Sequence, residues 1–265
     1  MEQPKYKYIY GPVSSWRLGR SLGIDPISSF QKTCTFDCVY CQSGRTEVFS
    51  GKREVFVPTE TLIHELRSLP DVSVGYITFA GNGEPTLAKN LGEMIRAVKM
   101  ARDEKIAVIT NASLINRRDV VEDLLLADLV EAKLDACSAA SFKAINQPMP
   151  EILLEDIVEG LKAFRKIYKG HLTLQVMFVA GNKACAAAIA KIAHQIGPDE
   201  VEINTPLRAC TVKPLSLEDV EEITAIFRGI CGTGIKVRSV YEAKREKSLP
   251  FCRPSTERRR GKENF

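Results

Sequence analysis

Six short apolar segments alternate along this chain with longer segments of helical periodicity. The segments expected to form strands are residues 75–80, 105–110, 128–134, 172–179, 200–204 and 235–241. Between them, apolar residues recur at helical spacing in stretches expected to form helices, which are residues 59–68, 90–103, 117–126, 152–168, 184–196 and 216–229. This alternation favours βαβ units around a parallel sheet. An α/β fold class is therefore expected.

Polar residues or glycine closely follow five of these expected strands. They are Gly83, Asn111, Asp135, Asn182 and Asn204. Ligand sites in parallel α/β folds gather at the carboxyl ends of the strands, so these residues are expected to share one site. A dinucleotide-binding or nucleotide-phosphate loop is not expected, because the sequence contains neither G-x-G-x-x-G nor a Walker A motif.

Three cysteines, Cys34, Cys38 and Cys41, lie within eight residues at the spacing C-x₃-C-x₂-C. Thiolates this close can converge on one inorganic centre, and cysteine thiolates are the usual ligands of iron–sulfur clusters, normally four of them. A cluster held by three would leave one iron open to another ligand. A zinc site would also use such thiolates, with four ligands or with three and a water. The nearest histidine in the sequence is His64.

The two ends of the chain differ from its middle. Residues 1–33 are punctuated by glycine and proline and are expected to form an irregular lead-in. Residues 242–265 hold eight Lys/Arg and four Asp/Glu, which equals the whole chain's formal charge of +4 and leaves residues 1–241 neutral. This basic C-terminal tail has few apolar residues and is expected to be extended or disordered. Domain boundaries of 1–241 and 242–265 follow from this contrast.

The cysteine motif, with Tyr40 before its last thiol, resembles the signature of the radical S-adenosylmethionine (SAM) superfamily. Gly81-Asn82-Gly83-Glu84-Pro85 is similar to the family's GGEP-type motif, which binds the SAM amino group. Thr110-Asn111-Ala112 resembles its T-N-G motif, with alanine in place of glycine. The resemblance covers about residues 6–240 and implies a partial (β/α)₆ TIM-like barrel of parallel strands, a [4Fe–4S] cluster and SAM as cofactors.

The resemblance also implies roles for individual residues. Cys34, Cys38 and Cys41 would hold the cluster, whose open iron is chelated by SAM. Reductive cleavage of SAM then yields a 5′-deoxyadenosyl radical that abstracts hydrogen from substrate. Residues expected along SAM are Tyr40, Gly83, Glu84, Asn111 and Asn182. Residues that could face SAM or substrate are Lys133, Asp135, Asn204 and Arg208.

The substrate stays open among several classes. Residues 11–23 resemble the lead-in of a subgroup related to the tRNA wyosine-base synthases, but those enzymes carry further N-terminal cysteines and none precedes Cys34. A glycyl-radical activase acting on a protein partner is another candidate, and a non-enzymatic zinc-binding module is the last. The neutral body favours a small-molecule or peptide substrate, and only the tail offers phosphate contacts to tRNA.

Partners and location follow from the same features. The resemblance implies an electron donor of ferredoxin or flavodoxin type. No secretory signal and no membrane-spanning run is recognised, so no membrane contact is expected. Eight cysteines without a secretory signal are typical of a reducing compartment, which predicts a cytoplasmic location.

Overall fold

The computed structural model of the protein describes residues 6–243 and 247–260. Its strands are β1 (Ile9–Ser15), β2 (Gly19–Ile24), β3 (Thr33–Cys34), β4 (Val48–Phe49), β5 (Tyr76–Phe79), β6 (Lys105–Thr110), β7 (Leu129–Lys133), β8 (His171–Met177), β9 (Glu200–Asn204) and β10 (Lys236–Ser239). Its α-helices are α1 (Thr59–Arg67), α2 (Leu91–Ala101), α3 (Arg118–Leu124), α4 (Ala139–Ile145), α5 (Leu154–Ile167), α6 (Ala186–Ile196), α7 (Leu217–Cys231) and α8 (Arg253–Arg260). Short 3₁₀ turns are η1 (Pro85–Leu87), η2 (Lys183–Cys185) and η3 (Gly232–Gly234).

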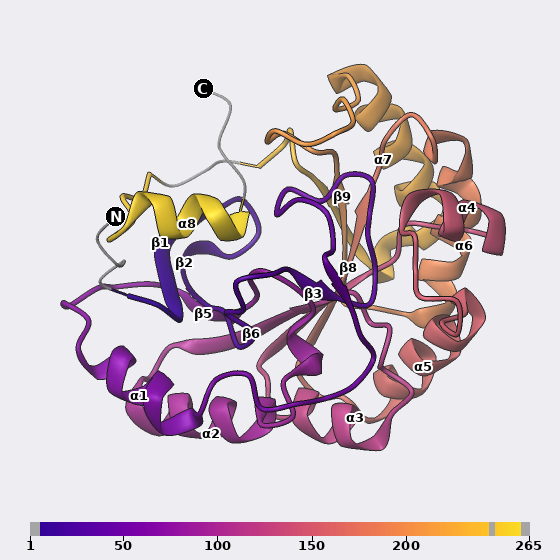
Figure 1. Ribbon diagram of the computed structural model, residues 1–265. Coiled ribbons are helices and arrows are strands. Elements are labelled where there is room, and N and C mark those ends of the chain that lie inside the picture. Colours follow the sequence, from indigo (N-terminus) through magenta and orange to yellow (C-terminus); the bar gives the residue numbers. More distant parts are fainter. Residues whose placement is uncertain (1–5, 244–246, 261–265) are drawn as a thin grey trace.

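Within the described residues one eight-stranded sheet runs in the order β1-β2-β5-β6-β7-β8-β9-β10. Strands β2 and β5 to β10 are parallel, and β1 joins the edge antiparallel to β2. The sheet is curled, with helices α1 to α3 and α5 to α7 along its outer side (Figure 1). The expected partial barrel is confirmed, and its six expected strands are β5 to β10.

The helices cover the sheet through apolar stripes. In α2, the side chains of Leu91, Met94, Ile95 and Val98 are all fully buried. Their spacing places them on one face of the helix. Burying each such side chain contributes about 1.5–3 kcal/mol relative to exposure. The stripe therefore fixes which face of α2 meets the sheet.

The lead-in differs from the expected irregular segment, because it forms the β1–β2 hairpin. Glycines conceal both strands from pattern recognition. Gly11 has φ +102° next to a register irregularity in β1. At Gly23 in β2 the ring of Tyr10 fills the space that a side chain would need, with an added Cβ 2.2 Å from the ring. Both glycines therefore lie within strands, and the hairpin adds two strands to the edge of the sheet.

The tail also differs from expectation, because residues 253–260 form helix α8 beside β1 (Figure 1). The Thr256 hydroxyl accepts a hydrogen bond from Gly11 N at 3.2 Å. The Arg259 guanidinium, with a side chain 3% exposed, pairs with the buried carboxylate of Asp25 at 2.8 Å. Helix α8 is attached by specific polar contacts rather than an apolar stripe, so hydrophobic patterning could not reveal it. The domain boundary at residue 241 stays a prediction.

The sequence pattern predicts Thr59 as the N-cap of the helix expected at 59–68, and Ser216 with Asp219 as a capping box for the helix expected at 216–229. The Ser216 hydroxyl accepts from Asp219 N at 3.1 Å, as expected for the start of α7. At α1 the N-cap is Pro58, and the Thr59 hydroxyl, expected to cap, instead accepts from the Asn90 side chain at 3.0 Å. Thr59 is therefore the first helical residue rather than the cap.

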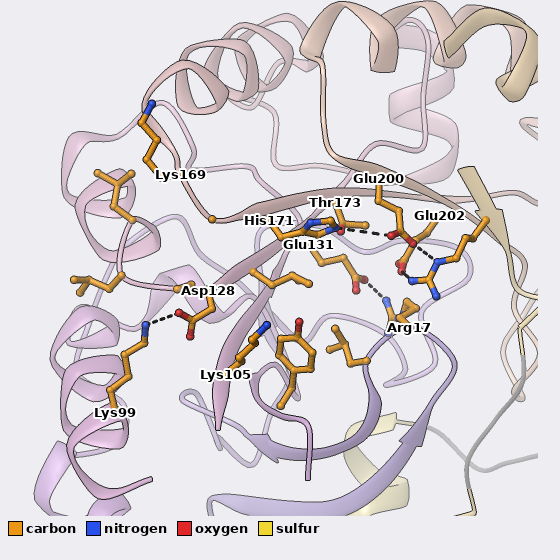
Figure 2. A pocket seen from close by; sticks show the side chains of 18 residues that line it. Arg17, Lys99, Lys105, Asp128, Glu131, Lys169, His171, Thr173, Glu200 and Glu202 are labelled. Atoms are coloured by element: carbon orange, nitrogen blue, oxygen red, sulfur yellow. Dashed lines mark hydrogen bonds and ion pairs between the residues drawn. The ribbon is translucent and has the colours of Figure 1, made fainter. Parts of the chain in front are cut away.

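The inner side of the curled sheet carries charged side chains at the amino ends of its strands. They line a cavity of about 610 Å³ (Figure 2). Arg17, from the turn of the β1–β2 hairpin, pairs with Glu131 of β7. Arg238 of β10 pairs with Glu200 and, at 3.1 Å, with Glu202 of β9. The hairpin turn therefore reaches across the inside of the barrel and is held there by an ion pair.

No helix among the described residues is both long and apolar enough to cross a membrane.

Candidate active site

The three cysteines of the motif occupy the loop that begins at β3. Cys34 ends β3, and Cys38 and Cys41 follow it; all three are free thiols. Burial raises the pKa of Cys34 and of Cys38 to about 12. A cation bound beside these thiols would stabilise their thiolate form.

Each of these sulfurs faces a side-chain N–H donor from the protein. Asn111 Nδ2 lies 3.6 Å from Cys34 Sγ, and Asn146 Nδ2 lies 3.5 Å from Cys38 Sγ. Lys32 Nζ lies 3.1 Å from Cys41 Sγ. The donors come from three separate parts of the chain, and they meet the motif at one edge of the barrel.

The Gly81–Pro85 turn packs closely on the cysteine strand. Gly83 has φ +148°, and an added Cβ would lie 2.0 Å from the carbonyl oxygen of Thr33. The same oxygen accepts a hydrogen bond from Glu84 N at 3.2 Å. Only glycine fits this approach. In this structure Gly83 therefore serves to seat the turn against the residue that precedes Cys34.

The carboxylate of Glu84 joins the ends of β5 and β6. It accepts hydrogen bonds from the Thr86 hydroxyl at 2.7 Å, the Thr110 hydroxyl at 2.6 Å and Asn111 N at 2.7 Å. Thr86 N adds a fourth at 3.0 Å. The residue is 2% exposed. Burial raises its pKa, and these hydrogen bonds oppose the rise. Its carboxylate is thus occupied by the protein, and its expected place along SAM stays a prediction.

The Thr110-Asn111-Ala112 turn has, at Ala112, the left-handed backbone conformation that glycine favours. Ala112 has φ +61°, in the left-handed region. Its N–H donates to the Thr110 hydroxyl at 3.0 Å. The Asn111 side chain bridges outward, donating to the Thr35 hydroxyl at 2.7 Å and accepting from Ser113 N at 2.9 Å. Alanine in place of glycine therefore preserves the turn.

Asp135 lies at the centre of a buried polar cluster after β7. Its carboxylate accepts from the Tyr40 hydroxyl, from Asn146 Nδ2 at 2.8 Å and from Met177 N at 2.7 Å. The Lys133 ammonium is 3.1 Å from the same carboxylate and 5.0 Å from the centre of the Tyr40 ring. Three expected site residues, Tyr40, Lys133 and Asp135, are therefore brought together.

The remaining expected site residues are Asn182, Asn204 and Arg208. Asn182 is fully buried and donates to the carbonyl oxygens of Asp135 and Met177 at 2.8 and 3.0 Å. It therefore links the ends of β7 and β8. Asn204 and Arg208 line a cavity of about 190 Å³. Arg208 Nη1 donates to Gln42 Oε1 at 3.1 Å, next to Cys41.

Comparison with known proteins decides the family. Residues 28–185 match the Radical SAM superfamily. The UPF0026 protein slr1464 of Synechocystis is 42% identical over 211 residues, which are 79% of this chain and 78% of that protein. The UPF0026 protein MJ1312 of Methanocaldococcus jannaschii is 39% identical, over 88% of this chain and 75% of that one. The chain belongs to the radical SAM superfamily.

A solved structure shares the fold at low identity. The crystal structure of Streptococcus suis SuiB bound to the precursor peptide SuiA aligns with a TM-score of 0.64 and 15% identity. The alignment covers 84% of this chain and 49% of that one, so this chain spans about half of SuiB. At this identity the likeness concerns the barrel alone.

Membership makes this protein a radical SAM enzyme with a [4Fe–4S] cluster and SAM as cofactors. The interpretation as a non-enzymatic zinc-binding module is thereby set aside. Radical SAM enzymes also need an electron donor. Resemblance to the wyosine-related subgroup stays a prediction.

The donor set fits the cluster. Thiolates are its usual ligands, and N–H groups aimed at the sulfurs stabilise their negative charge. In this chain Lys32, Asn111 and Asn146 are those donors. Lys32 and Asn146 were missed by sequence reasoning, because neither follows an expected strand. Proximity to Cys34 was the only local signal for Lys32, and Asn146 had none.

Removing the Glu84 carboxylate is expected to weaken SAM binding about tenfold and to leave the cluster's visible absorbance unchanged. Glu84→Ala releases Asn111 N and the Thr110 hydroxyl, so the turn at the end of β6 loses its support. The motif resemblance also places the SAM amino group at this edge, and loss of one hydrogen bond to that charged group would cost about 1.5–3 kcal/mol, or roughly tenfold or more in SAM affinity. Equilibrium SAM binding to the cluster-loaded protein measures this.

The matched control is Glu93→Ala, which removes an exposed carboxylate from α2. Its SAM affinity should equal that of the wild type. Loss of cluster absorbance in Glu84→Ala would contradict the prediction, because it would place Glu84 among the supports of the cysteine strand.

Proposed function

We propose that Cys34, Cys38 and Cys41 hold the [4Fe–4S] cluster and that this site generates a substrate radical inside the partial barrel. The observation that carries this proposal is that three N–H donors, from Lys32, Asn111 and Asn146, reach the three sulfurs of one motif. When bound, the cluster and SAM supply the 5′-deoxyadenosyl radical. The protein supplies position, charge and exclusion of water.

In this proposal the residues expected to face SAM or substrate have two roles: some shape the strand ends, and the others line the site with polar side chains. Gly83, Glu84, Asn111 and Asn182 shape the strand ends on which SAM would lie, because their side chains or backbone are bonded to neighbouring strands. The Lys133 ammonium lies at the end of β7, where Gln175 Oε1 at 2.7 Å and the Asp135 carboxylate at 3.1 Å hold it. Tyr40, Asp135, Asn204 and Arg208 are the other polar side chains that would line the site.

The substrate class we favour is a small molecule or a peptide. One arginine of the basic tail is used within the protein, because Arg259 pairs with the buried carboxylate of Asp25 at 2.8 Å. This leaves fewer tail cations for the phosphates of tRNA. Modification of tRNA and activation of a glycyl-radical protein stay as alternatives, with no contact in the described residues that favours them.

The electron donor we propose is of ferredoxin or flavodoxin type. Cys41 is half-buried and lines a cavity of about 350 Å³ with Cys38 and Arg45. The Arg45 guanidinium pairs with the Asp37 carboxylate at 3.2 Å, and because its side chain is 84% exposed it can also contact an acidic donor protein. All eight cysteines are free thiols, which supports a reducing, cytoplasmic setting.

Reduction of the reconstituted protein in the presence of SAM is expected to release 5′-deoxyadenosine and methionine, slowly even without substrate. Chromatography with mass detection measures both products. S-adenosylhomocysteine with a methylated product and no 5′-deoxyadenosine would contradict the proposal, since it would indicate ordinary methyl transfer.

A further inference from the structure

Asn204 and Arg208 share their 190 Å³ cavity with residues from distant parts of the chain. The hairpin turn contributes Trp16 and Arg17, and the last turn of α8 contributes Arg260. The cavity thus lies where the lead-in, the ends of β8 and β9 and the tail helix meet. The lead-in was expected only as an irregular segment, and the tail was expected to offer phosphate contacts to tRNA rather than to line a cavity of the barrel.

Three of the described residues that line this cavity are arginines, and none of the described lining residues is acidic. Arg17 is held by Glu131, as Figure 2 shows. Arg208 donates to the Gln42 amide, and Arg260 donates to the Ser14 carbonyl oxygen. Arg17 and Glu131 both also line the 610 Å³ cavity, so Arg17 contributes to the smaller cavity as one half of an ion pair. Arginine recognises carboxylate and phosphate oxygens through paired N–H groups.

The cavity adjoins the cysteine loop. Gln42 lines both this cavity and the 350 Å³ cavity that contains Cys38 and Cys41. A ligand in the arginine-lined cavity would therefore lie one side chain away from the proposed cluster site. That is where a substrate must lie if a radical formed at the cluster is to reach it.

We infer that the substrate carries an oxyanion, a carboxylate or a phosphate, which Arg208 and Arg260 bind in this cavity beside Arg17. This rests on the proposed function and narrows its substrate class. A volume of about 190 Å³ is below the usual range of 300–1,000 Å³ for small-molecule pockets. The cavity therefore suits the anionic end of a small metabolite, with the remainder extending toward the cysteine loop.

Isothermal titration calorimetry of the cluster-loaded, SAM-bound protein tests this with two probes, inorganic phosphate and succinate. At least one is expected to bind saturably, and the tighter probe identifies the headgroup. Arg208→Gln and Arg260→Gln should each weaken that binding about tenfold or more, because each removes a charged hydrogen-bond donor. Arg208→Lys should bind more tightly than Arg208→Gln, because it keeps the charge.

The matched control is Arg118→Gln, which removes an arginine with a 92% exposed side chain on α3. Its anion binding should equal that of the wild type. Urea midpoints of all variants establish that they fold.

Three results would overturn the inference. They are no saturable binding of either probe to the wild type, equal binding by Arg208→Gln and Arg118→Gln, and competition between the probe and SAM. The last would assign the arginines to the SAM carboxylate. Wild-type SAM cleavage in the same preparation separates the two claims: cleavage without anion binding overturns only this inference, whereas absence of cleavage overturns the proposed function.

Discussion

Cys38→Ala is expected to abolish the cluster and with it all formation of 5′-deoxyadenosine. Two remaining thiolates cannot hold the cluster, and Asn146 Nδ2 would lose the sulfur that it faces at 3.5 Å. The same result is expected for Cys34→Ala and Cys41→Ala. Iron analysis after anaerobic reconstitution should fall from about four atoms per chain, the content of one [4Fe–4S] cluster, to near zero.

The other cysteines supply the controls. Cys231 is buried in α7, and Cys231→Ala should keep about four iron atoms per chain. Cys210→Ala is the stricter control, because Cys210 lines the same cavity as Cys38 and Cys41 while its thiol donates to the carbonyl oxygen of Val212 at 3.1 Å. Loss of iron from Cys210→Ala, or clearly more iron than one cluster in the wild type, would contradict a single three-cysteine site.

The parts of the fold that were predicted correctly depend on local sequence pattern. The run at 105–110 coincides with β6, and the apolar spacing of α2 places its buried face correctly. The β1–β2 hairpin was missed because its strands contain glycines at positions 11 and 23. Glycine is required at such a position because of the neighbouring strand: at Gly23 the Tyr10 ring fills the space that a side chain would need. This requirement arises only when β1 and β2 are paired, so the sequence of either strand alone does not show it.

In the candidate site too, features set by local sequence could be predicted, whereas contacts between residues distant in the sequence could not. The cysteine spacing and the residues after the strands are local features, and the structure brings Tyr40, Lys133 and Asp135 together. The N–H donors to sulfur are not local. Asn146 meets Cys38 across 108 residues of sequence. Contacts of this kind depend on the order of strands around the barrel, so residue type and spacing could not identify them.

Burial of charge was the least predictable feature. An arginine-rich tail is usually solvated, and Arg, Asp and Glu are rarely fully buried without a partner. Here Arg259 is buried because it pairs with Asp25, which directly follows β2. Asp25 also packs against the next turn, since a Cβ added at Gly81 would lie 2.4 Å from its side chain. The tail helix, the hairpin and the Gly81–Pro85 turn are therefore linked through one carboxylate.

Arg259→Met is expected to lower the free energy of unfolding by about 3–5 kcal/mol, since breaking a buried ion pair leaves an uncompensated buried charge. The variant leaves the Asp25 carboxylate, 0% exposed, without the guanidinium that lies 2.8 Å away. It also removes donors to the Ser255 and Ser28 hydroxyls. Urea denaturation followed by circular dichroism measures the change.

Arg253→Met is the matched control on the same helix, because the Arg253 side chain is 69% exposed and pairs with Glu257 one turn away. Exposed pairs of this spacing contribute about 0.3–0.5 kcal/mol, so its urea midpoint should hardly move. Adding Asp25→Asn to Arg259→Met should recover part of the loss, because the double variant no longer buries a lone carboxylate. Equal losses in Arg259→Met and Arg253→Met would show that α8 is not held by this ion pair.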